Sequence, residues 1–246
     1  MYNFFVESDA RLGDVVSIGG GDFNHVKNVL RMKIGEKILV SIDGTSALCE
    51  IIEFTESSVV AKIVEEKFQD TALPISITLF QGLPKSDKME LIIQKAVELG
   101  IDKIVPVEMA RSIVKLDAKK AKDKVSRWQA IAESAAKQSK RTSIPSVELV
   151  MTFNNAVKSF SEYDLVLLPY ECKNGMQDTL SALKKIKSGM KVAILIGPEG
   201  GFDLKEVTQA EDAGTLTISL GKRILRTETA AITALSMLML YAEINL

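Results

Sequence analysis

Two glycine-rich segments in the last quarter of the chain carry the residues best suited to bind a ligand. They are Ile196–Phe202 (Ile-Gly-Pro-Glu-Gly-Gly-Phe) and Leu220–Thr229 (Leu-Gly-Lys-Arg-Ile-Leu-Arg-Thr-Glu-Thr). Each follows a short β-branched run and precedes a stretch of helical character. In open parallel sheets, ligands bind beyond the carboxyl ends of the strands, where glycine admits positive φ and close backbone approach. We therefore expect the two segments to form one ligand site, although either alone could be an ordinary strand-to-helix loop.

The spacing of these glycines argues against two common nucleotide sites. The first segment lacks the G-x-G-x-x-G spacing of dinucleotide-binding folds, and no G-K-[ST] follows it as in a P-loop. An adenosine that carries an amino-acid tail fits better, because backbone groups and apolar walls would bind it, with Glu199 or Glu228 as a nearby carboxylate. The segments therefore favour a neutral or cationic ligand over a phosphate.

Arg226, Thr227 and Glu228 stand where the last predicted helix begins. We expect Thr227 to be the N-cap and Glu228 to lie in the first turn, since a helix N-terminus favours acidic side chains. A cation is disfavoured at that place, so Arg226 is the residue from which a functional role is expected.

Composition narrows the class of protein. The chain has 246 residues with 31 Lys and Arg against 32 Asp and Glu, so only a local patch could bind a polyanion. The cysteines Cys49 and Cys172 lie far apart, which indicates a reducing compartment, and together with a single histidine they predict no metal site. The apolar stretch Ala230–Ala242 is shorter than the roughly 20 residues that span a bilayer. With no leader pattern, we expect a cytoplasmic protein that binds neither membrane nor metal.

The first part of the chain, residues 1–70, predicts a small β-barrel. We expect five short strands and one helix there, the helix over Asp22–Met32, with Asp43-Gly44 as a hairpin turn. The polar segment Gln69–Pro74 is predicted to be a linker. The strand-like runs identified are Tyr2–Val6, Lys37–Ile42, Ala47–Phe54 and Ser58–Val64.

From Ile75 onward, strand-like and helix-like segments alternate, which predicts an α/β fold with a mostly parallel sheet. Ser86 is expected to cap the first helix, and Asp203 with Glu206 forms a capping-box pattern. The predicted strands are 75–80, 104–107, 165–168, 192–196 and 216–219, and the predicted helices are 86–99, 118–139, 203–214 and 227–243.

Basic residues are concentrated between Arg111 and Arg141, largely on the long predicted helix. Such a run is usually a solvated helix face, but next to a small barrel that is itself basic the run favours phosphate binding. His25, the single histidine, is expected to be structural or to donate to RNA, because a catalytic histidine needs an oriented partner.

The glycine-rich segments resemble the two C-terminal signatures of one known family, the bacterial RsmE family of 16S ribosomal RNA uracil-N3 methyltransferases in the SPOUT class. The resemblance covers essentially the whole chain. Further segments that match the family are His25–Gly35, Gln81–Lys85, Lys88–Glu90, Gln94–Gly100, Arg111-Ser112, Arg127-Trp128 and Gln138–Arg141.

The resemblance implies two domains, a PUA-like RNA-binding β-barrel over residues 1–70 and a SPOUT α/β domain with a deep trefoil knot over residues 75–246. It also implies S-adenosyl-L-methionine as cofactor, 16S rRNA of the 30S subunit as partner, and a homodimer. We expect the last helix to lie partly in the dimer interface, through Ile232, Leu235, Met237, Leu238, Met239 and Leu240.

Mapped residue by residue, the resemblance assigns the site. The implied cofactor-binding residues are Leu168, Pro169, Tyr170, Glu171, Ile196, Gly197, Pro198, Glu199, Gly200, Gly201, Ser219, Leu220, Gly221, Ile224, Leu225, Arg226 and Thr227. The RNA-binding residues that we expect are His25, Lys27, Arg31, Lys33, Arg111, Arg127, Lys140, Arg141, Lys222 and Arg223.

The expected activity is methylation of N3 of a specific uridine. Arg226 is expected to stabilise negative charge that develops on the base, and Glu228 is a second catalytic candidate, as a base or as a carboxylate near the cofactor. One alternative is a non-catalytic RNA-binding or ribosome-assembly protein with the same fold. Another is a small-molecule enzyme that uses the α/β domain alone. Arg226, Glu228 and the glycine segments argue against the first, and the basic helix and barrel argue against the second.

Overall fold

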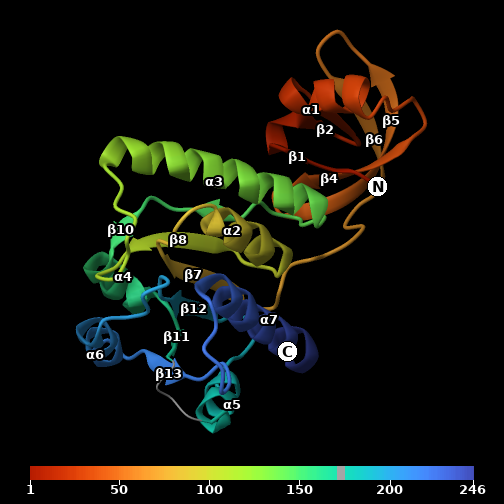
Figure 1. Ribbon diagram of the computed structural model, residues 1–246. Coiled ribbons are helices and arrows are strands. Elements are labelled where there is room, and N and C mark those ends of the chain that lie inside the picture. The colour runs from red at the N-terminus through yellow and green to blue at the C-terminus, as the bar shows by residue number, and fades with distance from the viewer. Residues whose placement is uncertain (171–174) are drawn as a thin grey trace. The chain divides into compact units, whose positions relative to one another are not determined.

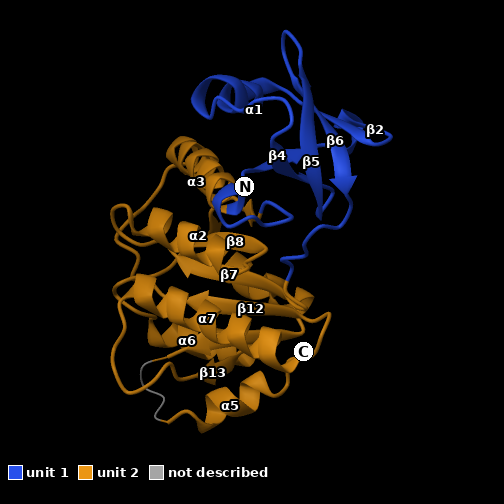
Figure 2. Ribbon diagram, turned by 90° about the vertical axis from the view of Figure 1, so that its right-hand side faces the viewer, with its two compact units in different colours: residues 1–72, 136–144 blue, residues 73–135, 145–246 orange. Residues whose placement is uncertain are grey.

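The computed structural model describes residues 1–170 and 175–246. These residues form two compact units, each with its own sheet and core (Figure 2). Unit 1 contains residues 1–72 and 136–144, and unit 2 contains residues 73–135 and 145–246. The sequence pattern did not predict that 136–144 joins the first unit.

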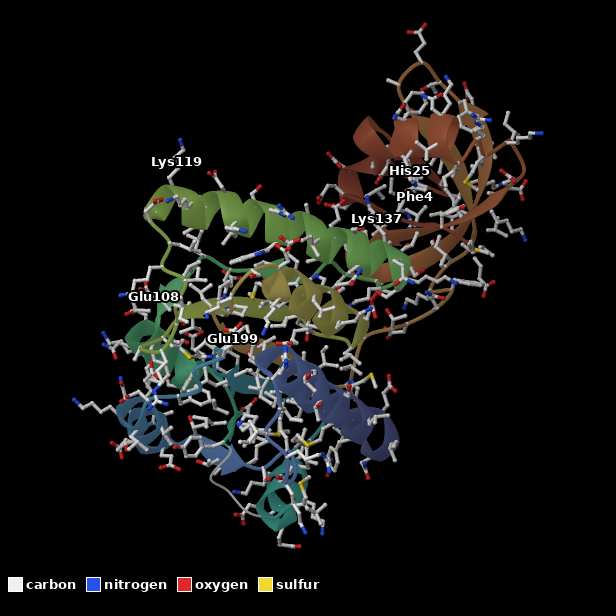
Figure 3. All side chains as sticks on the ribbon, viewed as in Figure 1. Phe4, His25, Glu108, Lys119, Lys137 and Glu199 are labelled. Carbon is white, nitrogen blue, oxygen red and sulfur yellow. The ribbon has the colours of Figure 1, made fainter. Side chains whose placement is uncertain are left out.

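Unit 1 is built on a six-stranded sheet in the order β1-β4-β5-β6-β3-β2. Its core is apolar and includes Phe4, which is labelled in Figure 3. The strands are β1 (Asn3–Val6), β2 (Arg11–Leu12), β3 (Val15–Ile18), β4 (Lys37–Ile42), β5 (Thr45–Phe54) and β6 (Val59–Glu65), and the helical turns are η1 (Ser8–Ala10), α1 (Gly20–Asn24) and η2 (His25–Val29).

Two details of unit 1 test the local predictions. The Asp43-Gly44 hairpin turn is confirmed, because it joins β4 to β5 and both residues have positive φ, 48° and 79°. The helix predicted over 22–32 is displaced, since α1 begins at Gly20, η2 ends at Val29 and Arg31 turns to φ 54°. The short strands β2 and β3 were missed.

Hydrogen bonds explain why residues 136–144 belong to unit 1. The buried Asn3 side chain donates to the Arg141 carbonyl at 2.9 Å and accepts from Ser41 at 3.1 Å. In the predicted linker, the Thr71 hydroxyl accepts from the Thr142 N–H at 3.1 Å, so this stretch is bonded to unit 1 rather than free. Asp22 also forms an ion pair with Lys137 at 2.9 Å.

Unit 2 contains a parallel sheet in the order β10-β8-β7-β12-β11-β13, with β9 paired to β8 (Figure 1). Every pairing among its described residues is parallel, as predicted. The strands are β7 (Ser76–Gly82), β8 (Lys103–Glu108), β9 (Ser146–Val147), β10 (Met151–Thr152), β11 (Leu165–Pro169), β12 (Lys191–Ile196) and β13 (Leu216–Ile218).

The helices of unit 2 pack on the sheet and on one another, with α2 against α7 and α4 against α6. They are α2 (Lys88–Glu98), α3 (Ala118–Gln138), α4 (Phe153–Ser159), η3 (Phe160–Glu162), α5 (Gln177–Leu183), α6 (Leu204–Asp212) and α7 (Thr227–Asn245). Among the residues that the structure describes, no helix is long and apolar enough to cross a membrane.

Of the helix N-termini predicted in unit 2 from capping residues, that of α6 is confirmed and that of α2 is wrong. The capping box is confirmed, because Asp203 accepts a hydrogen bond from the first turn of α6 while Glu206 accepts from the Asp203 N–H. Ser86 as the cap of α2 is wrong. It lies at φ 55°, Asp87 takes the cap position without a side-chain bond, and the helix begins at Lys88. The strands β9 and β10 and the helices α4 and α5 were not predicted.

Candidate active site

A pocket of about 520 Å³ lies in unit 2 where β11, β12 and β13 end. These three strands are neighbours, with β11 in the middle, so the segments that follow them meet at one edge of the sheet. The lining residues are Lys88, Pro169, Tyr170, Ile196, Gly197, Pro198, Glu199, Gly200, Gly201, Phe202, Ser219, Leu220, Gly221, Arg223, Ile224, Leu225, Arg226, Thr227 and Ala230.

The pocket brings together both glycine-rich segments, and nearly all the residues expected to bind a cofactor line it. Leu168 does not, because its side chain is wholly buried in the apolar core of unit 2. Glu171 lies outside the described residues. Sequence reasoning assigned no site role to Lys88, although it belongs to a segment that matched the family.

The glycines in and beside the two segments provide room as well as conformational freedom. Gly201 has φ 68° and Gly221 has φ 111°, as expected for such loops. Gly197 differs, because it is not among the residues with positive φ and a Cβ there would lie 3.2 Å from the Phe202 ring. A Cβ on Gly82, at the end of β7, would lie 2.7 Å from the Pro198 nitrogen. The segment therefore packs directly on β7.

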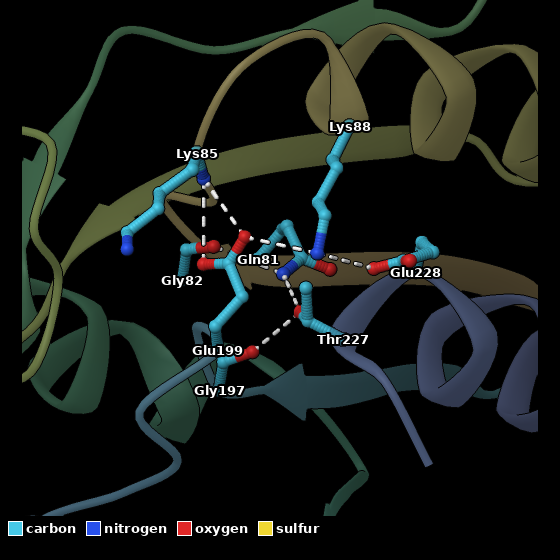
Figure 4. Close-up of polar contacts among 8 residues, drawn as sticks. All are labelled: Gln81, Gly82, Lys85, Lys88, Gly197, Glu199, Thr227 and Glu228. Atoms are coloured by element: carbon cyan, nitrogen blue, oxygen red, sulfur yellow. Dashed lines mark hydrogen bonds and ion pairs between the residues drawn. The ribbon is translucent and has the colours of Figure 1, made fainter.

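Thr227 connects the two glycine-rich segments of the pocket to strand β7. Its hydroxyl donates to the Gly197 carbonyl at 2.6 Å and accepts from the Gln81 amide at 3.0 Å (Figure 4). Gln81 is fully buried and also donates to the Gly82 carbonyl at 2.9 Å. The prediction that Thr227 caps α7 is wrong. Arg226 occupies the cap position with extended backbone. The Thr227 hydroxyl instead bonds Gly197 and Gln81, which follow or belong to other strands of the sheet.

Two charged side chains of the pocket wall, Lys88 and Glu199, form a cluster with a third, Glu228. The Lys88 ammonium is 3.2 Å from a Glu199 oxygen and 3.1 Å from a Glu228 oxygen. Glu199 also accepts from the Lys85 N–H at 3.0 Å. The hydrogen bond to Glu228, with help from Glu199, raises the pKa of Lys88 above its usual value.

Both ends of the Lys88–Glu199 pair are charged at neutral pH. Partial burial opposes ionisation of Glu199, but backbone hydrogen bonds and the Lys88 ammonium hold the pKa of this carboxyl below its usual value. Glu228 does not line the pocket. It lies behind Lys88, with 16% of its side chain exposed.

Arg111, expected to contact RNA, supports the first glycine segment. Its guanidinium donates to the Gly200 carbonyl at 3.2 Å and lies 3.7 Å from Asp203. The neighbouring Ala110 N–H donates to Glu206 at 2.8 Å. The loop after β8 therefore holds the segment between β12 and α6 in place.

The remaining residues expected to bind RNA divide by exposure. His25, Lys27, Arg31 and Lys33 of unit 1 are exposed, as are Arg127, Lys140, Lys222 and Arg223. Lys119 extends away from α3 in the same manner (Figure 3). Arg127 forms an ion pair with Glu90 at 2.9 Å. The prediction that Arg141 contacts RNA is contradicted by its burial. Only 5% of it is exposed, and it belongs to the stretch 136–144 that is part of unit 1.

The last helix also divides by exposure. Leu235 and Leu238 are buried within unit 2, so the expectation that they contribute to a dimer interface is wrong. Ile232, Met237 and Met239 are half-buried and Leu240 is 51% exposed. Only these four residues of the expected set could contact a second subunit.

Within residues 1–170 and 175–246, no three His, Cys, Asp or Glu side chains form a group that could hold a metal ion. Cys49 is buried in unit 1, and burial raises the pKa of its thiol to about 11. Cys172 lies outside the described residues.

Most of the chain matches known RNA methyltransferases. Residues 71–239 match the model of an RNA methyltransferase domain, and residues 18–64 match an RNA methyltransferase PUA domain. The chain is 38% identical to ribosomal RNA small subunit methyltransferase E of Bacillus subtilis, covering 99% of this chain and 98% of that protein. Identity to the same enzyme of Mycobacterium bovis is 30%, over 94% and 88% of the two chains.

A solved structure shows the same fold. It is ribosomal RNA small subunit methyltransferase E from Neisseria gonorrhoeae bound to S-adenosyl methionine, with a TM-score of 0.83 and 30% identity. The match covers 98% of this chain and 97% of that one.

Proposed function

This chain belongs to the RNA methyltransferase family that includes ribosomal RNA small subunit methyltransferase E, and we propose that it methylates N3 of a uridine in 16S rRNA with S-adenosyl-L-methionine as donor. The observation that carries this proposal is that both glycine-rich segments line one pocket at the carboxyl edge of the parallel sheet. Ligands bind at that edge in open α/β sheets.

The residues present fit the cofactor. The pocket, about 520 Å³, combines apolar walls such as Ile196 and Leu225 with the backbone of Gly200 and Gly221. That volume lies within the range of pockets for small organic ligands. When bound, the cofactor supplies an activated methyl group on a positively charged sulfur. The residues that would hold it are those of segments 196–202 and 219–227, with Pro169 and Tyr170.

The chain's own residues have two tasks in this reaction. They must present the uracil edge to the donor in a fixed alignment, which can supply much of the rate, and they must stabilise the base as its N3 proton leaves. Arg226 lines the pocket, and its backbone is fixed at the start of α7. We assign to its guanidinium the stabilisation of negative charge on the uracil oxygens.

Glu228 receives a different role from the one expected for it. A carboxylate 3.1 Å from the Lys88 ammonium and away from the pocket wall is poorly placed to remove a proton from the base. We therefore propose that Glu228 holds Lys88 in position. The group that accepts the N3 proton then lies outside the cluster of Lys88, Glu199 and Glu228.

RNA binding is assigned to exposed basic residues of both units. Lys222 and Arg223 are exposed in the loop that also carries Arg226, which supports a role in contacting the phosphates beside the target base. Four exposed basic or polar residues of unit 1 are His25, Lys27, Arg31 and Lys33. We propose that this unit is a PUA-like β-barrel and that these residues bind RNA. We further propose action in the cytoplasm, where ribosomal subunits are assembled.

Two features of the family are proposed as well, a trefoil knot in unit 2 and a homodimer. The knot is supported by the way segment 219–227 is held between other segments. Ser219 is bonded to Thr179 of α5 at 2.7 Å, and Thr227 is bonded to Gly197 at 2.6 Å. The dimer is supported by the half-buried Ile232, Met237 and Met239 and the exposed Leu240 of α7, and sedimentation at micromolar concentration would test it.

The decisive experiment is transfer of labelled methyl groups to 30S subunits from cells that lack this protein, followed by mapping of the modified nucleotide. We expect N3-methyluridine with the wild type and a rate about 100- to 1000-fold lower with Arg226→Ala, because one charge-stabilising donor is lost. The thermal midpoint should change little, since Arg226 is exposed. RNA binding without any methyl transfer would favour the assembly-protein alternative.

A further inference from the structure

One ion pair lines the pocket with both of its charges accessible. The Lys88 ammonium and the Glu199 carboxylate lie 3.2 Å apart, and their side chains are 27% and 26% exposed. A cavity with a cation and an anion side by side in its wall is complementary to a ligand that carries both charges on neighbouring atoms.

Each member of this pair has a second partner that does not line the pocket (Figure 4). Lys88 forms an ion pair with Glu228 at 3.1 Å, and Glu199 accepts from the Lys85 N–H at 3.0 Å and 3.3 Å. If a ligand separates Lys88 from Glu199, neither charge is left without a partner. Opening the pair therefore avoids the penalty of an unpaired charge in a partly buried site.

Helix stability does not explain the position of Lys88. It is the first residue of α2, where the helix dipole disfavours a cation, and the cap residue Asp87 makes no side-chain bond. The two carboxylates come from other segments, the loop after β12 and the first turn of α7. The arrangement depends on the assembled pocket rather than on the helix itself.

We propose that Lys88 and Glu199 bind the amino-acid end of the cofactor, with Lys88 contacting its carboxylate and Glu199 its ammonium. The inference rests on the proposed function, because it takes S-adenosylmethionine as the ligand. It assigns Glu228 and the Lys85 N–H to keep the two side chains in place while the pair is open.

Calorimetry with three ligands tests this assignment without any methyl transfer. S-adenosylmethionine carries both charges of the amino-acid end, decarboxylated S-adenosylmethionine keeps only the ammonium, and 5′-methylthioadenosine has neither. The variants are Lys88→Met and Glu199→Gln. Matched controls are Lys95→Met and Glu98→Gln, which break an ion pair of 2.8 Å farther along α2.

We expect each lost charge contact to weaken binding about 10- to 100-fold. Lys88→Met should weaken S-adenosylmethionine by this factor and leave decarboxylated S-adenosylmethionine nearly unchanged. Glu199→Gln should weaken both of these ligands, and neither variant should change the affinity for 5′-methylthioadenosine. The wild type itself should prefer S-adenosylmethionine over its decarboxylated form by a similar factor, which requires no variant to fold.

Two results would overturn the assignment. One is an equal loss for all three ligands in Lys88→Met, which would show that the residue only supports the pocket. The other is a wild type that binds S-adenosylmethionine and its decarboxylated form equally well. Failure of the wild type to bind S-adenosylmethionine at all would instead refute the proposed function.

Discussion

Replacing Thr227 by valine removes one hydroxyl from the pocket wall and changes the side-chain volume very little. The Gly197 carbonyl, bonded at 2.6 Å, and the Gln81 amide, bonded at 3.0 Å, each lose a partner in a buried place. A buried polar group left unpaired costs about 1–3 kcal/mol. Gln81 keeps its bond to Gly82, so its share is at the low end, and we expect a total loss of about 2–4 kcal/mol of unfolding free energy.

Urea denaturation measures this loss, and Thr227→Ser is the matched control because it keeps the hydroxyl. The serine variant loses only a methyl group, about 1 kcal/mol. Because Gly197 and Thr227 both line the pocket, cofactor affinity by calorimetry should fall in Thr227→Val and be largely retained in Thr227→Ser. A valine variant as stable as the serine variant would show that the three segments are held by packing alone, and the reasoning would be refuted.

Four other changes have expected outcomes. Gly82→Ala places a Cβ 2.7 Å from the Pro198 nitrogen. It should therefore lower the free energy of unfolding by about 1–3 kcal/mol and weaken cofactor binding. In the control Gly21→Ala the new Cβ has no atom within 4 Å, so neither quantity should change. Gly221→Val forces a β-branched residue to φ 111° and should weaken cofactor binding, as calorimetry would show. Gly197→Val should do so as well, by collision with the Phe202 ring 3.2 Å away. Replacing Lys222 and Arg223 together by alanine should weaken RNA binding and reduce the slope of log affinity against log salt concentration by about two. A filter-binding series over salt concentration measures this slope.

Features that depend on a few neighbouring residues could be predicted from the sequence. The Asp43-Gly44 turn and the Asp203–Glu206 capping box are such features, because their partners lie within three residues. The parallel sheet could be predicted from the alternation of strands and helices. Collection of the two glycine-rich segments into one pocket followed from that topology, since parallel strands of one sheet end at the same edge, even with β11 between β12 and β13.

Errors arose where a side chain takes its partner from far along the chain. Thr227 has the local pattern of a helix cap, but its hydroxyl bonds Gly197 and Gln81. Arg141 belongs to a basic run typical of an exposed surface, yet its carbonyl accepts from Asn3 and its side chain is buried. Lys88 shows no signal of its own, because its two carboxylates follow more than a hundred positions later. Short helices such as α4 and α5 have too few turns to show a clear hydrophobic period.

The register of the central sheet has a consequence for how the protein is made. Strand β7 pairs with β12, with Ser76 opposite Lys191. During synthesis this pairing cannot form until the long stretch of chain up to β12 has been translated. Contacts of such high sequence separation fold slowly, and a chain paused before β12 leaves one side of β7 open to other strands. The pocket can close only after Thr227, near the end of the chain, has been synthesised and can bond Gly197. A ligand that binds only the completed pocket then draws the folding equilibrium toward the native state, so the supply of methyl donor contributes to the yield of folded enzyme as well as to its turnover.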